Sequence, residues 1–231
     1  MRASILPVLH TVLLSVALAP LDGEAQTIPS PYRFVERKQE SGLFAGLMSA
    51  DRGRFGYGPG GGPIVGGRWG IELSGPLSLE GVATLLSGRR DVIHPGRVEG
   101  ERKIGEAEQL LTMLEARLKF SLVGARAWHG LSPFIVAGGG IAFDLAGSAP
   151  DDGTLEPADV FEFGSSFIGT LGAGTRWFAT DRVALRTDAL FSLWEIPTPL
   201  GYADPARAFE AVAEKEWLRG LQVSVSAVVR W

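Results

Sequence analysis

The sequence predicts an all-β fold, namely an eight-stranded, antiparallel, up-and-down transmembrane β-barrel. Eight segments alternate apolar and polar residues at the period of a β-strand. Short and long connections alternate between these segments, as the turns and loops of membrane barrels do. The N-terminus has the pattern of an export signal. Together these three observations favour a membrane barrel over a soluble β-sandwich or a lipocalin-like barrel.

The N-terminal residues 1–25 have the pattern of a secretory signal peptide. Arg2 supplies a positive charge, an apolar run follows, and small residues precede a cleavage site near Ala25. The apolar run is shorter than the roughly 20 residues of a membrane-spanning helix. Residues 26–40 are polar and contain two prolines, so we expect a periplasmic leader there and the barrel in 41–231.

The first half of the barrel is expected to contain four strands. These are predicted at 41–50, 63–73, 76–86 and 110–122. The segment SGLFAGLMSA opens the series, and in the next two strands bulky apolar residues alternate with Arg68, Glu72 and Glu80. The fourth strand alternates most clearly, because leucines and a phenylalanine occupy the face opposite to Glu115 and Arg117.

The second half of the barrel repeats this pattern. Its strands are predicted at 133–145, 166–179, 182–193 and 221–231. The apolar face lies opposite to Asp144 in the fifth strand, to Arg176 in the sixth, and to Arg186 and Asp188 in the seventh. In the last strand every second residue is apolar up to Trp231. Segments of about ten residues are long enough to cross a bilayer when tilted by about 45°.

The connections differ in length and in composition. Short connections are expected at 74–75, 123–132 and 180–181, and long ones at 51–62, 87–109, 146–165 and 194–220. Within the last long connection, residues 204–218 are compatible with two structures. Asp204 and Pro205 could start a short helix, or the last strand could begin early and place Trp217 on its apolar face.

The polar faces of the strands predict the contents of the lumen. The residues expected to point inward carry both signs of charge: Arg68, Glu72, Glu80, Glu115, Arg117, Lys119, Asp144, Arg176, Arg186 and Asp188. An eight-stranded barrel is just wide enough for its own side chains to fill, and buried charges are costly unless they are paired. We therefore expect a structural network of paired charges formed by Glu80, Glu115, Arg117, Lys119, Arg176, Arg186 and Asp188. The alternative is a narrow polar pore.

Three aromatic residues are expected to anchor the barrel at a membrane interface. Phe120, Trp177 and Trp231 lie near the periplasmic ends of the fourth, sixth and eighth predicted strands, all on the apolar face, which places them at one level. Membrane barrels carry a girdle of aromatic side chains at this position.

Four sequence stretches carry a resemblance to a known family. They are GLFAG near the start, PFIVAGGG and GTLGAGTRW in the middle, and VSVSAVVRW at the end. Over residues 41–231 the chain resembles the small eight-stranded outer-membrane β-barrels of Gram-negative bacteria, of the OmpA transmembrane and OmpX-like kind. The resemblance implies a location in the bacterial outer membrane and contact with outer-membrane lipid. It also implies that the barrel-assembly machinery recognises the last strand, which ends at Trp231.

The function expected from the sequence is a structural or surface-interaction role through the extracellular loops, with a ligand that the sequence does not identify. The alternatives are a narrow-pore transport barrel and a lipid-modifying enzyme. Such an enzyme needs a nucleophile, a histidine and an acid, but His94 and His129 lie in connections without these partners. We therefore expect no catalytic residue.

The remaining motifs exclude other classes of function. GYGPGG at 56–61 matches a dinucleotide-binding pattern, but a strand follows it instead of a helix, so we expect a flexible outer loop. The net charge of −4 and the lack of a basic stripe argue against a nucleic-acid partner. Cysteine is absent, and no residue pattern indicates a metal site or a cofactor.

Overall fold

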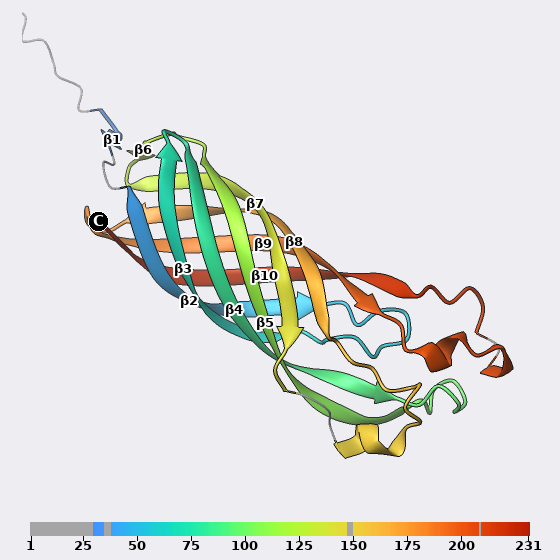
Figure 1. Cartoon of the computed structure of the whole chain (residues 1–231). Coiled ribbons are helices and arrows are strands. Elements are labelled where there is room, and N and C mark those ends of the chain that lie inside the picture. The colour runs from blue at the N-terminus through green and yellow to red at the C-terminus, as the bar shows by residue number, and fades with distance from the viewer. Residues whose placement is uncertain (1–29, 35–37, 147–149, 208) are drawn as a thin grey trace, which may run out of the picture. The chain divides into compact units, whose positions relative to one another are not determined.

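Eight long strands form a closed antiparallel barrel in the computed structural model of the chain (Figure 1). The structure describes residues 30–34, 38–146, 150–207 and 209–231, so the predicted signal peptide lies outside the described residues. The barrel strands are β2 (Gln39–Ala50), β3 (Gly62–Ser74), β4 (Leu77–Ile93), β5 (Lys103–Ser121), β7 (Leu131–Asp144), β8 (Ser165–Phe178), β9 (Val183–Pro197) and β10 (Lys215–Arg230). Each strand pairs with its neighbours, and β2 pairs with β10 to close the ring. The predicted fold class is confirmed.

Short elements complete the unit that runs from Pro31 to Trp231. Two three-residue strands, β1 (Tyr32–Phe34) and β6 (Arg126–Trp128), pair with each other. Three 3-10 turns follow, η1 (Pro150–Thr154), η2 (Leu200–Ala203) and η3 (Pro205–Arg207). The described part of the chain holds no helix with the length and apolar character needed to span a membrane.

The two ends of the barrel carry different connections (Figure 1). At the short-turn end, the strands are joined through residues 75–76, 122–130 and 179–182. At the long-loop end they are joined by the first long loop (51–61), the second (94–102), the third (145–164) and the fourth (198–214). The predicted alternation of short and long connections is therefore present.

Two strands extend further than the sequence indicated. β4 ends at Ile93 and β5 begins at Lys103, so each gains seven residues over the prediction, and they stay paired along this extension. The predicted strands stop where the regular alternation of apolar residues stops. In the extension, outward residues such as Arg89 and Glu108 are charged, which suits a hairpin that projects beyond the lipid-facing part of the barrel.

Of the two structures that the sequence allowed for residues 204–218, the described residues show helical backbone only in the 3-10 turn at Pro205–Arg207. β10 begins at Lys215, and its pairing with β9 extends from Lys215 opposite Pro197. Trp217 is 57% exposed on the outward face. The prediction that the last strand begins early is confirmed. The strand forms there because pairing with β9 satisfies the backbone hydrogen bonds.

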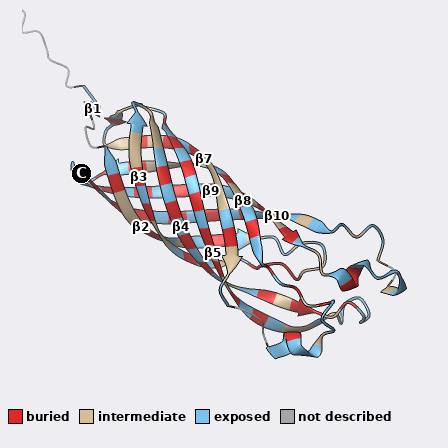
Figure 2. Ribbon diagram, in the orientation of Figure 1, coloured by how far each residue is buried: buried red, intermediate tan, exposed pale blue. Residues whose placement is uncertain are grey.

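The two faces of each strand have opposite environments, and Figure 2 shows buried and exposed residues alternating along the barrel wall. On β10, Leu221, Val223 and Val225 point outward and are about half exposed, whereas Ser224 and Ser226 point inward and are buried. The same apolar outer face recurs around the ring. An exposed apolar surface this extensive is unusual for a soluble monomer and typical of a barrel in lipid.

Glycines on the inner wall make room for large side chains. A β-carbon on Gly174 would lie against the ring of Phe134, and one on Gly66 would lie against the ring of Phe44. Both sites would also bring the added carbon against a backbone oxygen of the neighbouring strand. Gly174 on β8 and Gly66 on β3 thus relieve crowding in a narrow barrel.

This crowding predicts different effects for two glycine substitutions. We expect Gly174→Ala to lower the free energy of unfolding by about 1–3 kcal/mol, because the added methyl group overpacks the lumen. Gly81→Ala is the matched control, since a β-carbon there meets no atom within 4 Å. Urea unfolding in lipid vesicles, followed by tryptophan fluorescence, measures both changes. Equal stabilities of the two variants would contradict the packing argument.

Candidate functional site

The lumen has a charged half near the short-turn end and an apolar half near the long-loop end. Ten charged side chains are buried in the charged half: Glu40, Arg68, Glu80, Glu115, Arg117, Lys119, Arg176, Arg186, Asp188 and Arg230. Inward residues of the apolar half include Phe44, Met48, Ile64, Leu86, Leu111, Met113, Ile168, Trp194, Ile196 and Leu218. The sequence predicted most of these charges, but it missed Glu40 and the apolar half.

Arg186 on β9 is at the centre of the charged half. Its guanidinium is 0% exposed and donates to Glu80 Oε1 at 2.6 Å and to Asp188 Oδ1 at 2.7 Å. Arg68 donates from Nη1 to the other oxygen of Asp188 at 2.9 Å. Arg186 also lies over the ring of Phe134, 4.4 Å from its centroid. The ion pairs thus link β3, β4 and β9 inside the barrel, and the ring of Phe134 adds β7 to the cluster.

Glu40 forms a second centre that the sequence analysis assigned to the leader. β2 begins at Gln39, which places Glu40 in the lumen. Its carboxylate accepts hydrogen bonds from Lys119 and from Arg176 Nη1, the latter at 2.8 Å. Lys119 also contacts Glu80 at 2.6 Å, which joins the two centres into one network. The residues before Glu40 lack a strand pattern, so the local sequence does not predict that Glu40 lies in the lumen. Its role becomes visible only through its pairing with residues far away in the sequence.

The other predicted lumen charges occupy three environments. Arg117 pairs with Glu115, its neighbour on the inner face of β5, and the Thr170 hydroxyl donates to the same carboxylate. Glu72 is only partly buried and lines a cavity of about 30 Å³ at the short-turn mouth, room for about one or two water molecules. Asp144, at the opposite end, accepts hydrogen bonds from the backbone of Leu110 and of Ala146.

An aromatic cluster from three of the long loops covers the apolar half. Phe55 and Tyr57 come from the first long loop, Phe161 from the third, and Tyr202 and Phe209 from the fourth. The ring centroids of Phe55 and Tyr202 are 4.7 Å apart, and those of Tyr57 and Phe161 are 4.8 Å apart. The sequence contained an indication of this cluster, because aromatic residues are out of place in glycine- and proline-rich loops exposed to solvent.

Polar contacts tie the second long loop and the end of β4 to this cluster. The Arg102 guanidinium lies over the ring of Phe209, 4.7 Å from its centroid, and Tyr202 donates a hydrogen bond to the Ile93 carbonyl at 3.4 Å. Burial raises the pKa of the Tyr202 phenol, and the neighbouring Tyr57 and Asp159 raise it further. The phenol therefore stays neutral, as a side chain packed among rings requires.

The GYGPGG stretch is packed instead of being a flexible solvated loop. Tyr57 is 2% exposed, and residues 58–60 are also buried. The amide of Gly58 donates to the Arg52 carbonyl at 2.8 Å, and that of Gly60 donates to the Arg89 carbonyl at 3.1 Å. A β-carbon at Gly60 would collide with this Arg89 carbonyl, so the glycines serve close backbone approach.

Two ion pairs fix the third long loop to its surroundings. Arg90 on the β4 extension pairs with Asp152 in η1, and both side chains are buried. Arg207 in η3 pairs with the buried Asp159, and this hydrogen bond raises the pKa of the Arg207 guanidinium. These pairs connect the third loop with the extended hairpin on one side and with the fourth loop on the other.

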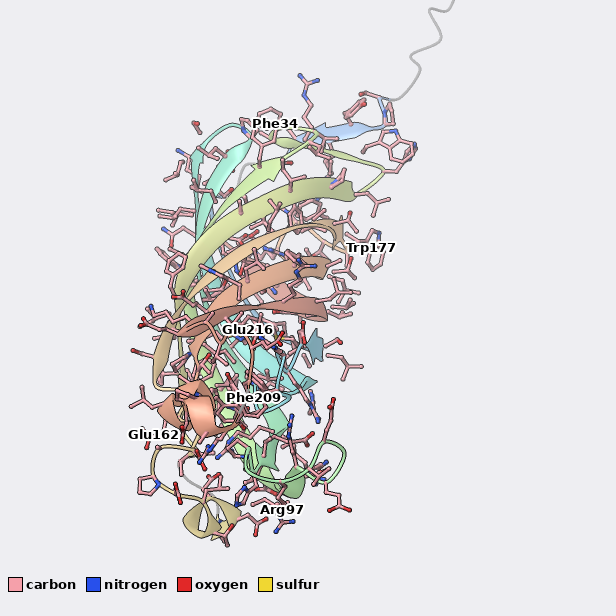
Figure 3. All side chains as sticks on the ribbon, turned by 90° about the vertical axis from the view of Figure 1, so that its right-hand side faces the viewer. Phe34, Arg97, Glu162, Trp177, Phe209 and Glu216 are labelled. Carbon is pink, nitrogen blue, oxygen red and sulfur yellow. The ribbon has the colours of Figure 1, made fainter. Side chains whose placement is uncertain are left out.

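The three predicted interfacial aromatics lie on the outward face at the short-turn end. Phe120, Trp177 and Trp231 are each about half exposed, and Figure 3 shows Trp177 projecting away from the ribbon. Trp231 also donates from its indole Nε1 to Gln39 Oε1 at 3.1 Å. This bond lies at the junction of β2 and β10 and reinforces the closure of the barrel.

The two histidines of the described residues each contact a neighbour within their own connection. His94 accepts a hydrogen bond from the Gly96 amide, and His129 lies edge-on to Trp128. No three His, Asp or Glu side chains of the described segments come together in a way that could hold a metal ion.

Comparison with known proteins identifies the fold. No protein-family model matches the sequence, and no curated protein matches it. The outer membrane protein OprG from Pseudomonas aeruginosa is similar in structure, with a TM-score of 0.55 and 11% sequence identity over 87% of this chain and 99% of that chain. Neisserial surface protein A (NspA) gives a TM-score of 0.51 and 13% identity over 84% of this chain and 97% of that chain. The chain thus has the fold of the small eight-stranded outer-membrane barrels, which confirms the predicted resemblance at the level of fold.

Proposed function

We propose that the protein is an outer-membrane β-barrel with a closed lumen, which acts through the surface formed by its four long loops. The short-turn end faces the periplasm in this proposal, and the long loops face the exterior. The observation that carries the proposal is the filling of the lumen by buried side chains. They run from the Glu40 and Arg186 ion pairs, through the apolar half, to the aromatic cluster under the loops.

The outward surface supports the membrane location. Between Trp231 and Leu221 on β10, the residues that point outward are apolar. Ten residues of a strand tilted by about 45° cover about 25 Å along the membrane normal, the height of the lipid-facing band in known barrels. The similarity in fold to OprG and NspA supports the same placement.

The packing of the loops supports a role at the surface. Phe55, Tyr202 and Phe209 are in mutual ring contact, and Arg102 covers Phe209. A loop surface with its own aromatic core presents a defined shape, and such a surface needs little ordering before it binds a partner.

A swelling assay on the purified protein tests the closed lumen. We expect proteoliposomes that contain the folded barrel not to swell in arabinose, because side chains fill the lumen over its length. Slower migration after boiling on a denaturing gel shows in the same sample that the barrel is folded. A general porin reconstituted in parallel gives the positive control. Swelling at the porin rate would overturn the closed-lumen proposal and favour the transport alternative.

A further inference from the structure

A groove opens on the outer surface of the third and fourth long loops. Its volume is about 720 Å³, within the range of known ligand sites. Apolar side chains form most of its lining, and they include Val160, Phe161, Pro197, Pro199, Leu200 and Val212. Leu200 is 82% exposed, although it is a large apolar residue. Phe161 is buried against Tyr57, so the apolar surface open to a partner is formed by Leu200, the two prolines and the partly exposed Val160 and Val212.

The rim of the groove is acidic. Glu162 and Glu214 line it, both are exposed, and neither forms an ion pair with a described residue. One cation, Lys215, also lines the groove, and it contacts Glu195 at 3.0 Å. Arg207 in the same loop pairs with Asp159. Figure 3 shows Glu162 projecting from the long-loop end. The two free carboxylates therefore attract positive charge to the edge of an apolar surface.

The acidic character extends over both loops that build the groove. Residues 145–164 and 198–214 contain eight acidic residues and one basic residue, a net charge of −7, whereas the whole chain has −4. The rest of the chain is therefore net positive. Asp152 and Asp159 are buried in ion pairs, whereas the other six acidic residues of these loops are exposed. These exposed carboxylates steer cationic partners towards this face.

We propose that this groove docks an extended peptide segment in which apolar side chains alternate with arginine or lysine. This inference rests on the proposed function and names the partner class of the loop surface. Apolar side chains of the partner would cover Leu200 and the adjacent prolines, and its cations would pair with Glu162 and Glu214. A lipid would fit less well, because its phosphate would meet two carboxylates of the same sign.

Fluorescence anisotropy with a labelled peptide tests the proposal on the full barrel in phosphatidylcholine nanodiscs. The probe is Arg-Leu-Pro-Leu-Arg, and the comparison peptides carry Glu in place of Arg or Ser in place of Leu. We expect the probe to bind and both comparison peptides to bind at least about tenfold more weakly. Raising the salt from about 50 mM to about 300 mM weakens binding of the probe, because exposed charge pairs are screened.

Three variants locate the binding site. Glu162→Gln combined with Glu214→Gln removes both charges at constant shape, and we expect about threefold to tenfold weaker binding. Leu200→Asp places a charge on the apolar floor and should reduce binding at least as much. Glu99→Gln combined with Glu101→Gln is the matched control, since these exposed residues lie in the second long loop away from the groove. This control should leave binding unchanged.

The outcomes separate this inference from the proposed function. The docking site is wrong if the probe does not bind, if the comparison peptides bind equally well, or if the control variant weakens binding as much as the groove variant. A phospholipid or lipid A molecule retained by the purified barrel and lost in Leu200→Asp, as detected by native mass spectrometry, would also overturn it. None of these results depends on whether the lumen conducts solutes, so the swelling assay tests the closed lumen independently.

Discussion

Arg186→Ala is expected to lower the free energy of unfolding by about 3–5 kcal/mol, because it leaves two buried carboxylates without their shared cation. Glu80 and Asp188 both accept hydrogen bonds from this guanidinium, and all three side chains are buried. Lys119 and Arg68 remain as partners, one for each carboxylate. They prevent complete loss of pairing, so we expect a barrel that folds and unfolds at lower urea concentration.

Two further variants make this test specific to the network. Arg186→Lys keeps the charge but cannot donate to both carboxylates with the geometry of a guanidinium, so its stability should fall between those of the wild type and the alanine variant. Arg182→Ala, in the exposed turn before β9, should change stability by less than about 0.5 kcal/mol. Urea titration in vesicles of fixed composition measures all three. If Arg186→Ala unfolds like Arg182→Ala, the network does not stabilise the barrel.

Val225→Arg is expected to destabilise the inserted barrel by about 2–4 kcal/mol, because it places a cation against the hydrocarbon core. Val225 lies outward on β10, about midway between Leu221 and Trp231, and is about half exposed. If Val225 faced water instead, an arginine at this position would change the stability of the barrel very little. This prediction therefore tests whether the apolar outer face meets lipid.

The control for Val225→Arg is the same substitution outside the predicted lipid band. Val98 lies in the second long loop and is 75% exposed, so Val98→Arg should leave insertion and stability unchanged. Heat-modifiable migration measures the folded fraction after refolding into vesicles. Normal insertion of Val225→Arg would place this face in water and contradict the membrane barrel.

Much of the fold was predictable because lipid outside and charge inside impose a strict alternation. Arg117 and Lys119 alternate with Leu118 and Phe120 on β5, and the structure places these two pairs on opposite faces. The alternation of apolar and polar residues weakens near the long-loop end. There Val82 and Leu86 of β4 point into the apolar half while Leu85 points outward, so both faces are apolar and the period of two fades.

The candidate site depended on information that no local pattern contains. Glu40 meets Lys119 and Arg176 across 79 and 136 residues of sequence, and only the closed ring brings them together. The aromatic cluster likewise joins loops that are far apart in the chain. Local reasoning could identify most of the lumen charges, but it missed Glu40 and could not assign the partner of each charge.

The charged half of the lumen contains six cations and four carboxylates among its ten buried charges. Glu72, at the short-turn mouth, adds one more negative charge and still leaves the cations in excess. In a narrow passage with few water molecules, an uncompensated positive charge lowers the barrier for anions and raises it for cations. A form of this barrel engineered to open would therefore be anion-selective.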